Sequence, residues 1–539
     1  MTHGGGQLGR GVCQIRMFNS GVCGRPIYGQ IGGVEKSPVC LMHSHNPSKN
    51  PRDFLAEFER ILADAGTGVA NFAGFVFPDE SLPTRKFIAE CIFNDAEFLG
   101  FADFLGSEFA NRVVFSQTVF RKHAAFTGAT FEKDAVFAWA SFLRGAEFGA
   151  ATFRQIAQFQ EAQFAGPVQF RGTEFDRDAI FKSAYFEAEA YFGGLMAVYG
   201  AGVDAPFDKD RLFRPTVFKG EVNFHGAAFM GRVEFRETRF DIASSRKHRM
   251  IFTSVHLERP SRVVFYKTDL RTALLHNSDV SEVVFSNVLW RRRANGKKMV
   301  LEEECSTSPT EEVTEALLAK EESPDTRNYG LIEELYQQLK KNYDDKRDYR
   351  TAGDFHYGEM EMKRLATPPR NAATRWLKGK GITGQRFDAV RAWWHKRLSP
   401  IAWYRYASEY GESYSRPVLW LGVILISFAL LYPIAGLDLA ASSRTGRALS
   451  DVSTIEVSHP SAMSYSRAFG CAQRPSPCAG LTVTFGHSLM TAIGVAAFRR
   501  NIQYEPAYPW GRLLSILEIV LTSSLLALFL LALRRQFKR

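Results

Sequence analysis

The stretch FNDAEFLGFADFLGSEFANRVVFSQTVFRKHAAF, residues 93–126, has a phenylalanine at every fifth or sixth position. Steps of five and six residues alternate without a slip as far as Phe192. From Phe98 onward the residue two places before each Phe is Ala, Ser, Thr or Val, and 13 of these 18 residues are Ala. An α-helix cannot keep positions about 5.5 residues apart on one face. A chain that turns at each step can stack every Phe on another one coil away, which predicts a β-solenoid.

The Phe ladder explains why the chain holds 45 Phe but only 8 Trp and 18 Tyr. It breaks at Gly193 to Pro206, resumes from Phe207 to Phe240 and decays towards Phe285. The break predicts a protruding loop or a bend. If two 11-residue units make one coil, the ladder forms about nine coils and spans roughly 40 Å at ~4.8 Å per strand.

This pattern resembles the pentapeptide-repeat family, in which a central Leu or Phe and a small residue two places earlier point into the core. The resemblance covers about 200 residues and implies a right-handed quadrilateral β-helix at 93–290. The extra residue in every second unit departs from a uniform five. Because the segment holds 23 Lys/Arg and 24 Asp/Glu, it lacks the acidic face by which some members mimic DNA. We expect a rigid spacer or a scaffold for a protein partner, with no catalytic constellation, no enzyme activity and no nucleic-acid partner.

Residues 1–50 contain three cysteines and a histidine with metal-ligand character: Cys13, Cys23, Cys40 and His43. Three thiols and an imidazole suit a closed tetrahedral zinc site, and the CxxH spacing suits two ligands on one turn. Short Cys/His knuckles also precede the repeats in some bacterial proteins that this chain resembles. The alternative is three free thiols. In the following segment, 51–92, the apolar spacing predicts a capping helix at Asp53 to Ala65 and a first strand.

Two different segments follow the repeats. Residues 291–326 are charged, without apolar periodicity, and predict a flexible linker. Residues 327–367 carry two apolar stripes at helical spacing and predict a helical hairpin. This hairpin resembles one found between pentapeptide repeats and channel-like membrane domains. It is either a packed connector or a docking site for a partner helix.

The C-terminal part has the features of a membrane module. Pro417 to Leu437 is uncharged, and Leu513 to Leu533 is interrupted only by Glu518, so both are long enough to span a bilayer. Much of the net charge of +10 lies in the juxtamembrane segment 368–416, where Arg370 to Arg416 holds ten Lys/Arg and three Asp/Glu. This positive-inside signature predicts an inner-membrane protein with two spans and cytoplasmic termini. An outer loop would then hold Cys471 and Cys478, either as a disulfide or as free thiols.

Within 417–539, two long apolar segments with a short one between them resemble the two-transmembrane potassium-channel module. The resemblance places the filter at the pore-lining candidates Thr491, Ala492, Ile493, Gly494 and Val495, in a homo-tetramer. With Gly494 alone, potassium selectivity is not implied. Glu518 is a further pore candidate, or else it reaches the interface or pairs with Arg512. The leading interpretation is a channel-like pore controlled by a cytoplasmic solenoid. The alternative is a non-conducting membrane scaffold whose solenoid binds a protein.

Overall fold

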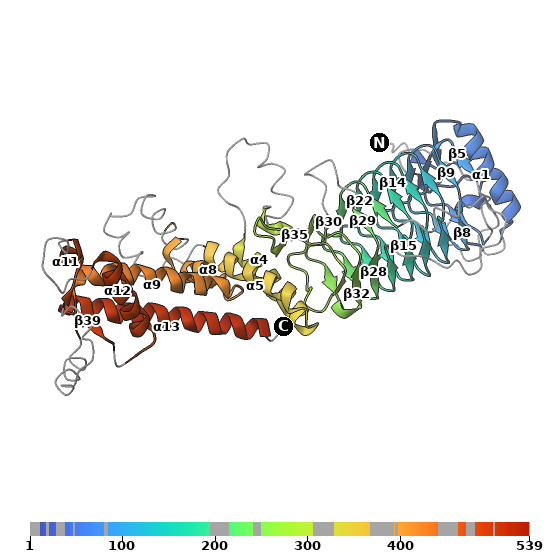
Figure 1. Cartoon of the computed structure of the whole chain (residues 1–539). Helices are drawn as coiled ribbons and strands as arrows, with labels where there is room; N and C mark the ends of the chain where they lie inside the picture. Colours follow the sequence, from blue (N-terminus) through green and yellow to red (C-terminus); the bar gives the residue numbers. More distant parts are fainter. Residues whose placement is uncertain are drawn as a thin grey trace, which may run out of the picture. The chain divides into compact units, whose positions relative to one another are not determined.

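The computed structural model describes residues 11–17, 21–28, 38–46, 49–79, 85–193, 215–240, 250–304, 328–366, 393, 397–439, 462–469, 480–499 and 502–537. The chain divides into two compact units, Met1–Lys346 and Arg347–Arg539. The first contains the solenoid and its two caps, and the second contains the long apolar helices (Figure 1).

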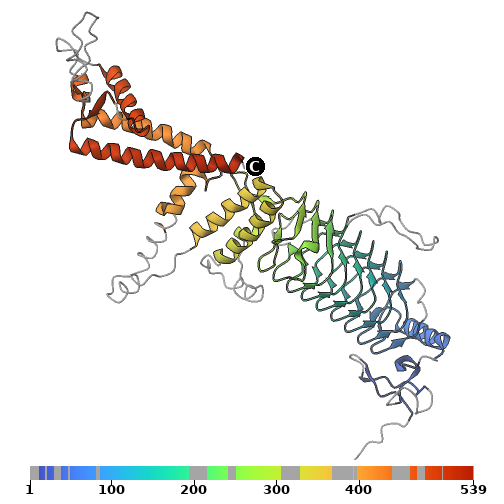
Figure 2. The same ribbon diagram turned by 90° about the horizontal axis from the view of Figure 1, so that it is seen from below.

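The solenoid has four faces, each a parallel sheet of very short strands (Figures 1 and 2). The first sheet has nine strands: β3 (Val69–Asn71), β6 (Glu90–Ile92), β10 (Val113–Val114), β14 (Ala135–Val136), β18 (Ala157–Gln158), β22 (Ala179–Ile180), β26 (Val222–Asn223), β30 (Met250–Ile251) and β33 (Ala273–Leu274). The second has eight: β4 (Val76–Phe77), β7 (Glu97–Phe98), β11 (Val119–Phe120), β15 (Ser141–Phe142), β19 (Gln163–Phe164), β23 (Tyr185–Phe186), β27 (Ala228–Phe229) and β31 (His256–Leu257).

The third sheet also has eight strands: β8 (Ala102–Asp103), β12 (Ala124–Ala125), β16 (Ala146–Glu147), β20 (Val168–Gln169), β24 (Ala190–Tyr191), β28 (Val233–Arg236), β32 (Val263–Tyr266) and β34 (Val284–Ser286). The fourth has seven: β5 (Lys86–Phe87), β9 (Glu108–Phe109), β13 (Thr130–Phe131), β17 (Thr152–Phe153), β21 (Glu174–Phe175), β25 (Val217–Phe218) and β29 (Arg239–Phe240). The sheets therefore include strands that precede Phe93, where the regular ladder begins.

One coil of the regular part takes 22 residues. Val113 pairs with Ala135, and Phe120 pairs with Phe142. The rings of Phe115 and Phe137 stack with centroids 5.0 Å apart and planes 10° apart. The prediction of a Phe-cored solenoid with two 11-residue units per coil is confirmed, and its core is a column of stacked rings.

Alternating corners explain the alternating steps. Each five-residue step turns through a left-handed residue three places before its second Phe, such as Gly128 at φ 68° or Trp139 at φ 58°. From Phe98 to Phe192, where every residue is described, no six-residue step contains a residue with positive φ. The extra residue therefore replaces the left-handed turn with a wider corner.

The small inward-facing residue tolerates a hydroxyl because the backbone supplies an acceptor. The hydroxyl of Thr118 donates to the carbonyl of Phe93 at 2.7 Å, and that of Thr173 donates to the carbonyl of Phe148 at 2.7 Å. Both threonines are fully buried. An unpartnered hydroxyl in this core would be costly, so the contact across coils is what allows Thr in place of Ala.

The break in the ladder leaves the pairing intact. Phe175 pairs with Phe218, which is 43 residues later instead of 22, so 21 residues have been added between β24 and β25. Residues 194–214, where the sequence predicts a loop or a bend, lie outside the described part of the chain.

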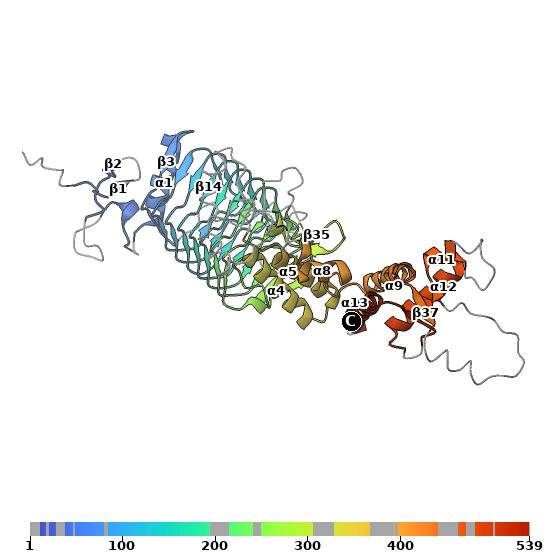
Figure 3. The same cartoon turned by 90° about the vertical axis from the view of Figure 1, so that its left-hand side faces the viewer.

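Helix α1 (Pro51–Ala65) covers the first coil (Figure 3). It starts with Asn50, whose side chain accepts from Arg52 N, and ends at Gly66 with φ 54°. The rings of Phe54 and Phe58 are buried against Phe77 and Phe72, with centroids 5.1 and 4.6 Å apart. The amphipathic helix predicted at this place is confirmed.

The other end of the solenoid corrects the linker prediction. Residues 291–304 are not a linker, because β35 (Arg291–Arg292) pairs with β36 (Lys298–Met299) and the 3₁₀ turn η3 (Leu301–Glu303) follows. Burial of Met299, Val300 and Leu301 outweighs the charges around them. Residues 305–327 lie outside the described ranges. A second short 3₁₀ turn, η2, spans Pro260–Arg262.

Helix α4 (Tyr329–Asp345) covers this last part of the solenoid. The Asn342 side-chain amide donates to the carbonyls of Val280 and Val283 at 2.9 and 2.7 Å, and Trp290 Nε1 donates to Tyr343 Oη at 2.9 Å. The two Asn342 bonds satisfy backbone carbonyls that another coil would otherwise use.

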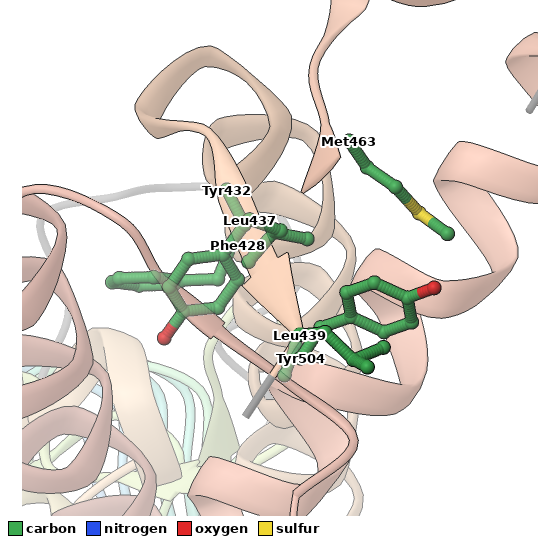
Figure 4. Close-up of a cluster of buried hydrophobic side chains, with 7 residues drawn as sticks. Phe428, Tyr432, Leu437, Leu439, Met463 and Tyr504 are labelled. Atoms are coloured by element: carbon green, nitrogen blue, oxygen red, sulfur yellow. The ribbon is translucent and has the colours of Figure 1, made fainter. Parts of the chain in front are cut away.

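The second unit begins with α5 (Tyr349–Leu365) and α8 (Pro400–Ser408). It continues with α9 (Ser415–Ala435), β37 (Leu437–Leu439), β38 (Ala462–Met463), α11 (Tyr465–Phe469), α12 (Leu481–Ala496), β39 (Tyr504–Pro506) and α13 (Pro509–Phe537). By length and composition, α9 and α13 could each cross a membrane. The three short strands form an antiparallel sheet in the order β38-β37-β39. Its side chains meet those of α9 and α12 in a core of Phe428, Tyr432, Leu437, Leu439, Met463, Ala492 and Tyr504 (Figure 4).

Candidate functional site

The N-terminal segment folds so that its cysteines converge. Strands β1 (Arg16–Met17) and β2 (Gly21–Val22) form a small antiparallel ribbon, with Cys13 before it and Cys23 after it. Backbone bonds from Cys13 N to Arg25 O and from Gly24 N to Cys13 O hold these two sides together at 2.8 and 3.0 Å. The 3₁₀ turn η1 (Leu41–His43) adds Cys40 and His43.

The four predicted ligands form one compact cluster, with all four ligand atoms within 4.8 Å of one another. His43 Nδ1 lies 3.5 Å from Cys13 Sγ and 3.2 Å from Cys40 Sγ, and the sulfurs of Cys23 and Cys40 are 3.7 Å apart. In a tetrahedral zinc site with bond lengths of about 2.3 Å to sulfur and about 2.0 Å to nitrogen, the ligand atoms lie roughly 3.5–3.8 Å from one another. Residues 30 positions apart in the sequence thus reach metal-ligand spacing.

The histidine ring is oriented by the solenoid. His43 Nε2 lies 3.2 Å from the carbonyl oxygen of Ala73, and the ring packs edge-on against Phe75. The tautomer that donates from Nε2 to Ala73 leaves the Nδ1 lone pair directed towards the three sulfurs. A backbone carbonyl behind the ring is the usual support for a metal-binding imidazole.

The thiols interact strongly with one another. The hydrogen bond with Cys40 lowers the pKa of Cys23 to about 3, helped by His43 and Arg25. The same bond, together with burial, raises the pKa of Cys40. Arg25 Nη1 lies 3.5 Å from Cys23 Sγ, while its Nε donates to Glu57 of α1 at 3.0 Å. Arg25 therefore links the cysteine cluster to the capping helix.

The pore candidates of the second unit are helical. Thr491 to Val495 belong to α12, and only Ile493 among them is exposed. The carbonyls of Ile493, Gly494 and Val495 accept from Ala497 N, Arg499 N and Phe498 N at 2.9, 2.9 and 3.1 Å. A filter of the potassium-channel type needs successive carbonyls turned towards an axis. Here the carbonyls of Ile493, Gly494 and Val495 are instead bonded to backbone amides at the end of α12.

Glu518 lies inside the helix packing of a single chain. It is fully buried, and its Oε2 accepts a hydrogen bond of 2.5 Å from the hydroxyl of Tyr432 on α9. Its Oε1 has no hydrogen-bond partner within the described part of the chain. The sequence prediction missed Tyr432, although a tyrosine within an apolar span was a signal that a polar partner lies nearby. Arg512, considered earlier as a partner, makes no described bond to Glu518.

The predicted disulfide between Cys471 and Cys478 falls on residues outside the described ranges. The described free cysteines are the three of the N-terminal cluster and Cys91, which lies in β6. Burial raises the pKa of Cys91 to about 12, so its thiol is protonated and structural.

Comparison with known proteins identifies the repeat. A family model described as pentapeptide repeats (9 copies) matches residues 148–195. Neither the curated proteins nor the solved structures compared with the chain gave a match. The matched segment starts at Phe148, in the middle of the 22-residue coils, and coils with the same pairing extend on both sides of it. The chain therefore carries pentapeptide repeats, folded as a four-sided parallel β-solenoid, together with two helices that are long and apolar enough to cross a membrane.

Proposed function

We propose that the protein is a non-enzymatic, membrane-anchored scaffold, in which α9 and α13 hold the chain in a bilayer and the solenoid presents a rigid face to a protein partner. The observation that carries this choice is the hydrogen bonding at the end of α12. Because the carbonyls of residues 493–495 are bonded to backbone amides, the chain lacks the carbonyl ring of a selective pore at that place.

The apolar surface of α9 and α13 supports the proposed membrane insertion. Leu419, Ile434 and Leu513 have exposed fractions of 65%, 63% and 67%. Because about two thirds of its surface is exposed, each such side chain in water would cost about 1–2 kcal/mol relative to an apolar environment. The ends of the two helices that carry Arg416 and Arg534 are basic, which supports a cytoplasmic position for both ends in the proposed topology.

The solenoid suits binding because its outer charges are already fixed. Ion pairs run from coil to coil, such as Arg154 with Asp176 at 2.9 Å and Lys219 with Asp176 at 2.7 Å. Some large apolar side chains remain outside, including Trp139 and Tyr185, with exposed fractions of 47% and 41%. Because these side chains are already ordered, binding of a partner to this surface costs little side-chain conformational entropy.

The test has two parts. The full-length chain should stay with membranes after alkaline extraction, and purified protein in liposomes should give no ion flux above empty vesicles. If alkali released the chain from the membranes, the proposal that α9 and α13 anchor it in a bilayer would fail. Reproducible current under varied ions, pH and voltage would overturn the non-conducting scaffold.

A second candidate is an ion-conducting pore built from four chains. It is favoured by the order of a long, a short and a long apolar helix in α9, α12 and α13, with the short helix packed on both of the others. Flux together with a tetramer in detergent would support this candidate. A monomer in detergent would exclude a pore shared between chains.

We also propose that the Cys13, Cys23, Cys40 and His43 cluster holds a structural zinc ion. The support is the donor set and its spacing, together with the carbonyl of Ala73 behind the histidine. A bound zinc ion would cross-link the segments around β1, β2 and η1. It would have a structural role and no catalytic one. Elemental analysis should find one zinc per chain. Cys40→Ser should lose it, whereas Cys91→Ser, a matched cysteine outside the cluster, should keep it.

A further inference from the structure

Lys49 is a buried lysine at the N-terminal end of the solenoid, two residues before helix α1 begins. Its exposed fraction is 3%. A lysine is almost never this buried unless its ammonium group is paired with other polar groups. Lys49 is not one of the four candidate zinc ligands, so its burial must serve another purpose.

The ammonium group of Lys49 lies among three backbone carbonyls. Its Nζ donates to the carbonyl of Leu41 at 3.5 Å, to that of Ser44 at 2.7 Å and to that of Val76. It also lies 4.8 Å from the ring centroid of Phe54 on α1, within the range of a cation–π contact. An ammonium group has three N–H donors and no acceptor, so three carbonyls suit it.

Two of these carbonyls belong to the turn that carries half of the proposed zinc ligands. Cys40 directly precedes Leu41, and His43 directly precedes Ser44. Within the turn, the His43 amide donates to the carbonyl of Cys40 at 3.2 Å. Because Lys49 binds the backbone at both ends of η1, it fixes the turn from which this thiol and this imidazole reach the cluster.

The third carbonyl lies at the open end of the solenoid. Val76 belongs to β4, the terminal strand of the second sheet. The carbonyls on either side of it, those of Phe75 and Phe77, accept from amides of the next coil at 2.8 and 3.0 Å. Successive carbonyls of a strand point to opposite sides, so the Val76 carbonyl faces away from that coil. There the Lys49 ammonium stands in for the amide of a missing strand.

Other side chains of the same segment also bind the first coils. His43 Nε2 lies 3.2 Å from the carbonyl oxygen of Ala73, and His45 Nε2 lies 2.9 Å from a carboxylate oxygen of Glu97 on β7. The turn that would hold the metal is thus docked on the solenoid through several polar contacts. Lys49 alone among these residues binds both the backbone of the turn and the backbone of the terminal strand.

We propose that Lys49 is the positioning residue of the zinc site, and that zinc binding and capping of the solenoid are coupled through it. The ordered turn offers the carbonyls of Leu41 and Ser44 to Lys49, and Lys49 in turn caps Val76. Loss of the metal would release the turn, and with it the cap on β4. The inference rests on the proposed structural zinc, and it adds the residue that connects the metal to the solenoid.

The first experiment measures the zinc affinity of the full-length purified protein by competition with a chromophoric chelator. Lys49→Met removes the ammonium group but keeps an unbranched apolar side chain. It should weaken zinc binding about tenfold to a hundredfold, the usual effect of losing a residue that orients metal ligands. With Co²⁺ in place of zinc, its visible absorption spectrum should also change, because the spectrum reports ligand geometry.

Lys86→Met is the matched control. Lys86 lies on β5, the terminal strand of the fourth sheet, where it pairs with Glu108 at 2.5 Å and its side chain is exposed. This variant loses an ammonium group at the same end of the solenoid without touching η1. It should bind zinc as tightly as the wild-type protein does, with the same Co²⁺ spectrum.

Hydrogen exchange with mass spectrometry tests the coupling. Removal of zinc from the wild-type protein by a chelator should speed amide exchange in Val69–Phe77 but not in residues 130–192. If exchange in Val69–Phe77 stays the same, the coupling is overturned. Faster exchange of residues 130–192 in Lys49→Met would show general destabilisation and would overturn the positioning role.

The results also separate this inference from the zinc proposal. If the wild-type protein takes up no zinc, the structural zinc itself fails. If the wild-type protein binds zinc, and Lys49→Met matches it in affinity and in Co²⁺ spectrum, the role of Lys49 alone is overturned.

Discussion

Replacing Phe137 by Ala tests whether the ring column holds the solenoid together. The Phe137 ring is fully buried, stacks on Phe115 and Phe159 at 5.0 and 4.9 Å, and meets Phe126 and Phe148 edge-on at 5.4 Å. Loss of a buried Phe costs ~3–5 kcal/mol, depending on how far the site can collapse. Here the strand ladders fix the coil spacing, so we expect the free energy of unfolding to fall by about 4–5 kcal/mol.

Hydrogen exchange with mass spectrometry measures this change coil by coil. Because repeat stability depends on nearest neighbours, amides in the coils that touch Phe137 should exchange roughly a thousandfold faster, at ~1.4 kcal/mol per tenfold. Trp139→Ala is the control, an aromatic change two residues away at an exposed fraction of 47%. It should alter exchange by less than tenfold. Equal exchange in the two variants would refute the view that stacked rings carry the stability.

Three further changes probe the coil. Thr173→Val introduces a side chain that the chain already has at the equivalent position, Val168. It should lower the free energy of unfolding in denaturant by about 1 kcal/mol, because it removes a hydrogen bond to a carbonyl one coil away. No loss of stability would show that this hydrogen bond does not stabilise the coil. Gly128→Ala, at φ 68°, should lower the free energy of unfolding by ~1–2 kcal/mol. Gly149→Ala, at a residue without positive φ where an added Cβ would make only ordinary contacts, should be nearly neutral. Similar losses in both variants would contradict the role of left-handed residues at the corners. Cys91 should resist alkylation at pH 8, far below its pKa of about 12, and become labelled only in denaturant; labelling at the rate of an exposed thiol would mean that the first coils open in the native protein.

The solenoid was predictable because single residues at regular positions determine how its core packs. One large and one small inward side chain recur every five or six positions, and the 22-residue coil follows from their spacing. The same holds for α1, whose apolar spacing matches a helix. The four candidate metal ligands at the N-terminus were predictable as a set from their chemistry. Their approach to within 4.8 Å depends on the β1–β2 ribbon, which their sequence spacing does not reveal.

Other features depend on contacts that no local pattern encodes. The hairpin at 291–304 has the composition of a linker, and it is ordered because Leu301 packs with Ile251 and Leu274 at the end of the solenoid. The pairing of Tyr432 with Glu518 joins residues 86 positions apart. Left-handed corners at Trp139 and Ala150 are also hidden, since neither residue type signals positive φ.

The direct pairing of Phe175 with Phe218 has a practical consequence for the evolution and engineering of this chain. The chain has 21 added residues between β24 and β25, and the 22-residue spacing returns in the pairing of Phe218 with Phe240. The strands after the insertion thus pair in the same register as before it, because each strand pairs with the strand of the preceding coil. New sequence can enter at a corner of such a solenoid while the repeat downstream stays in step, and this corner is the natural place to graft a foreign domain.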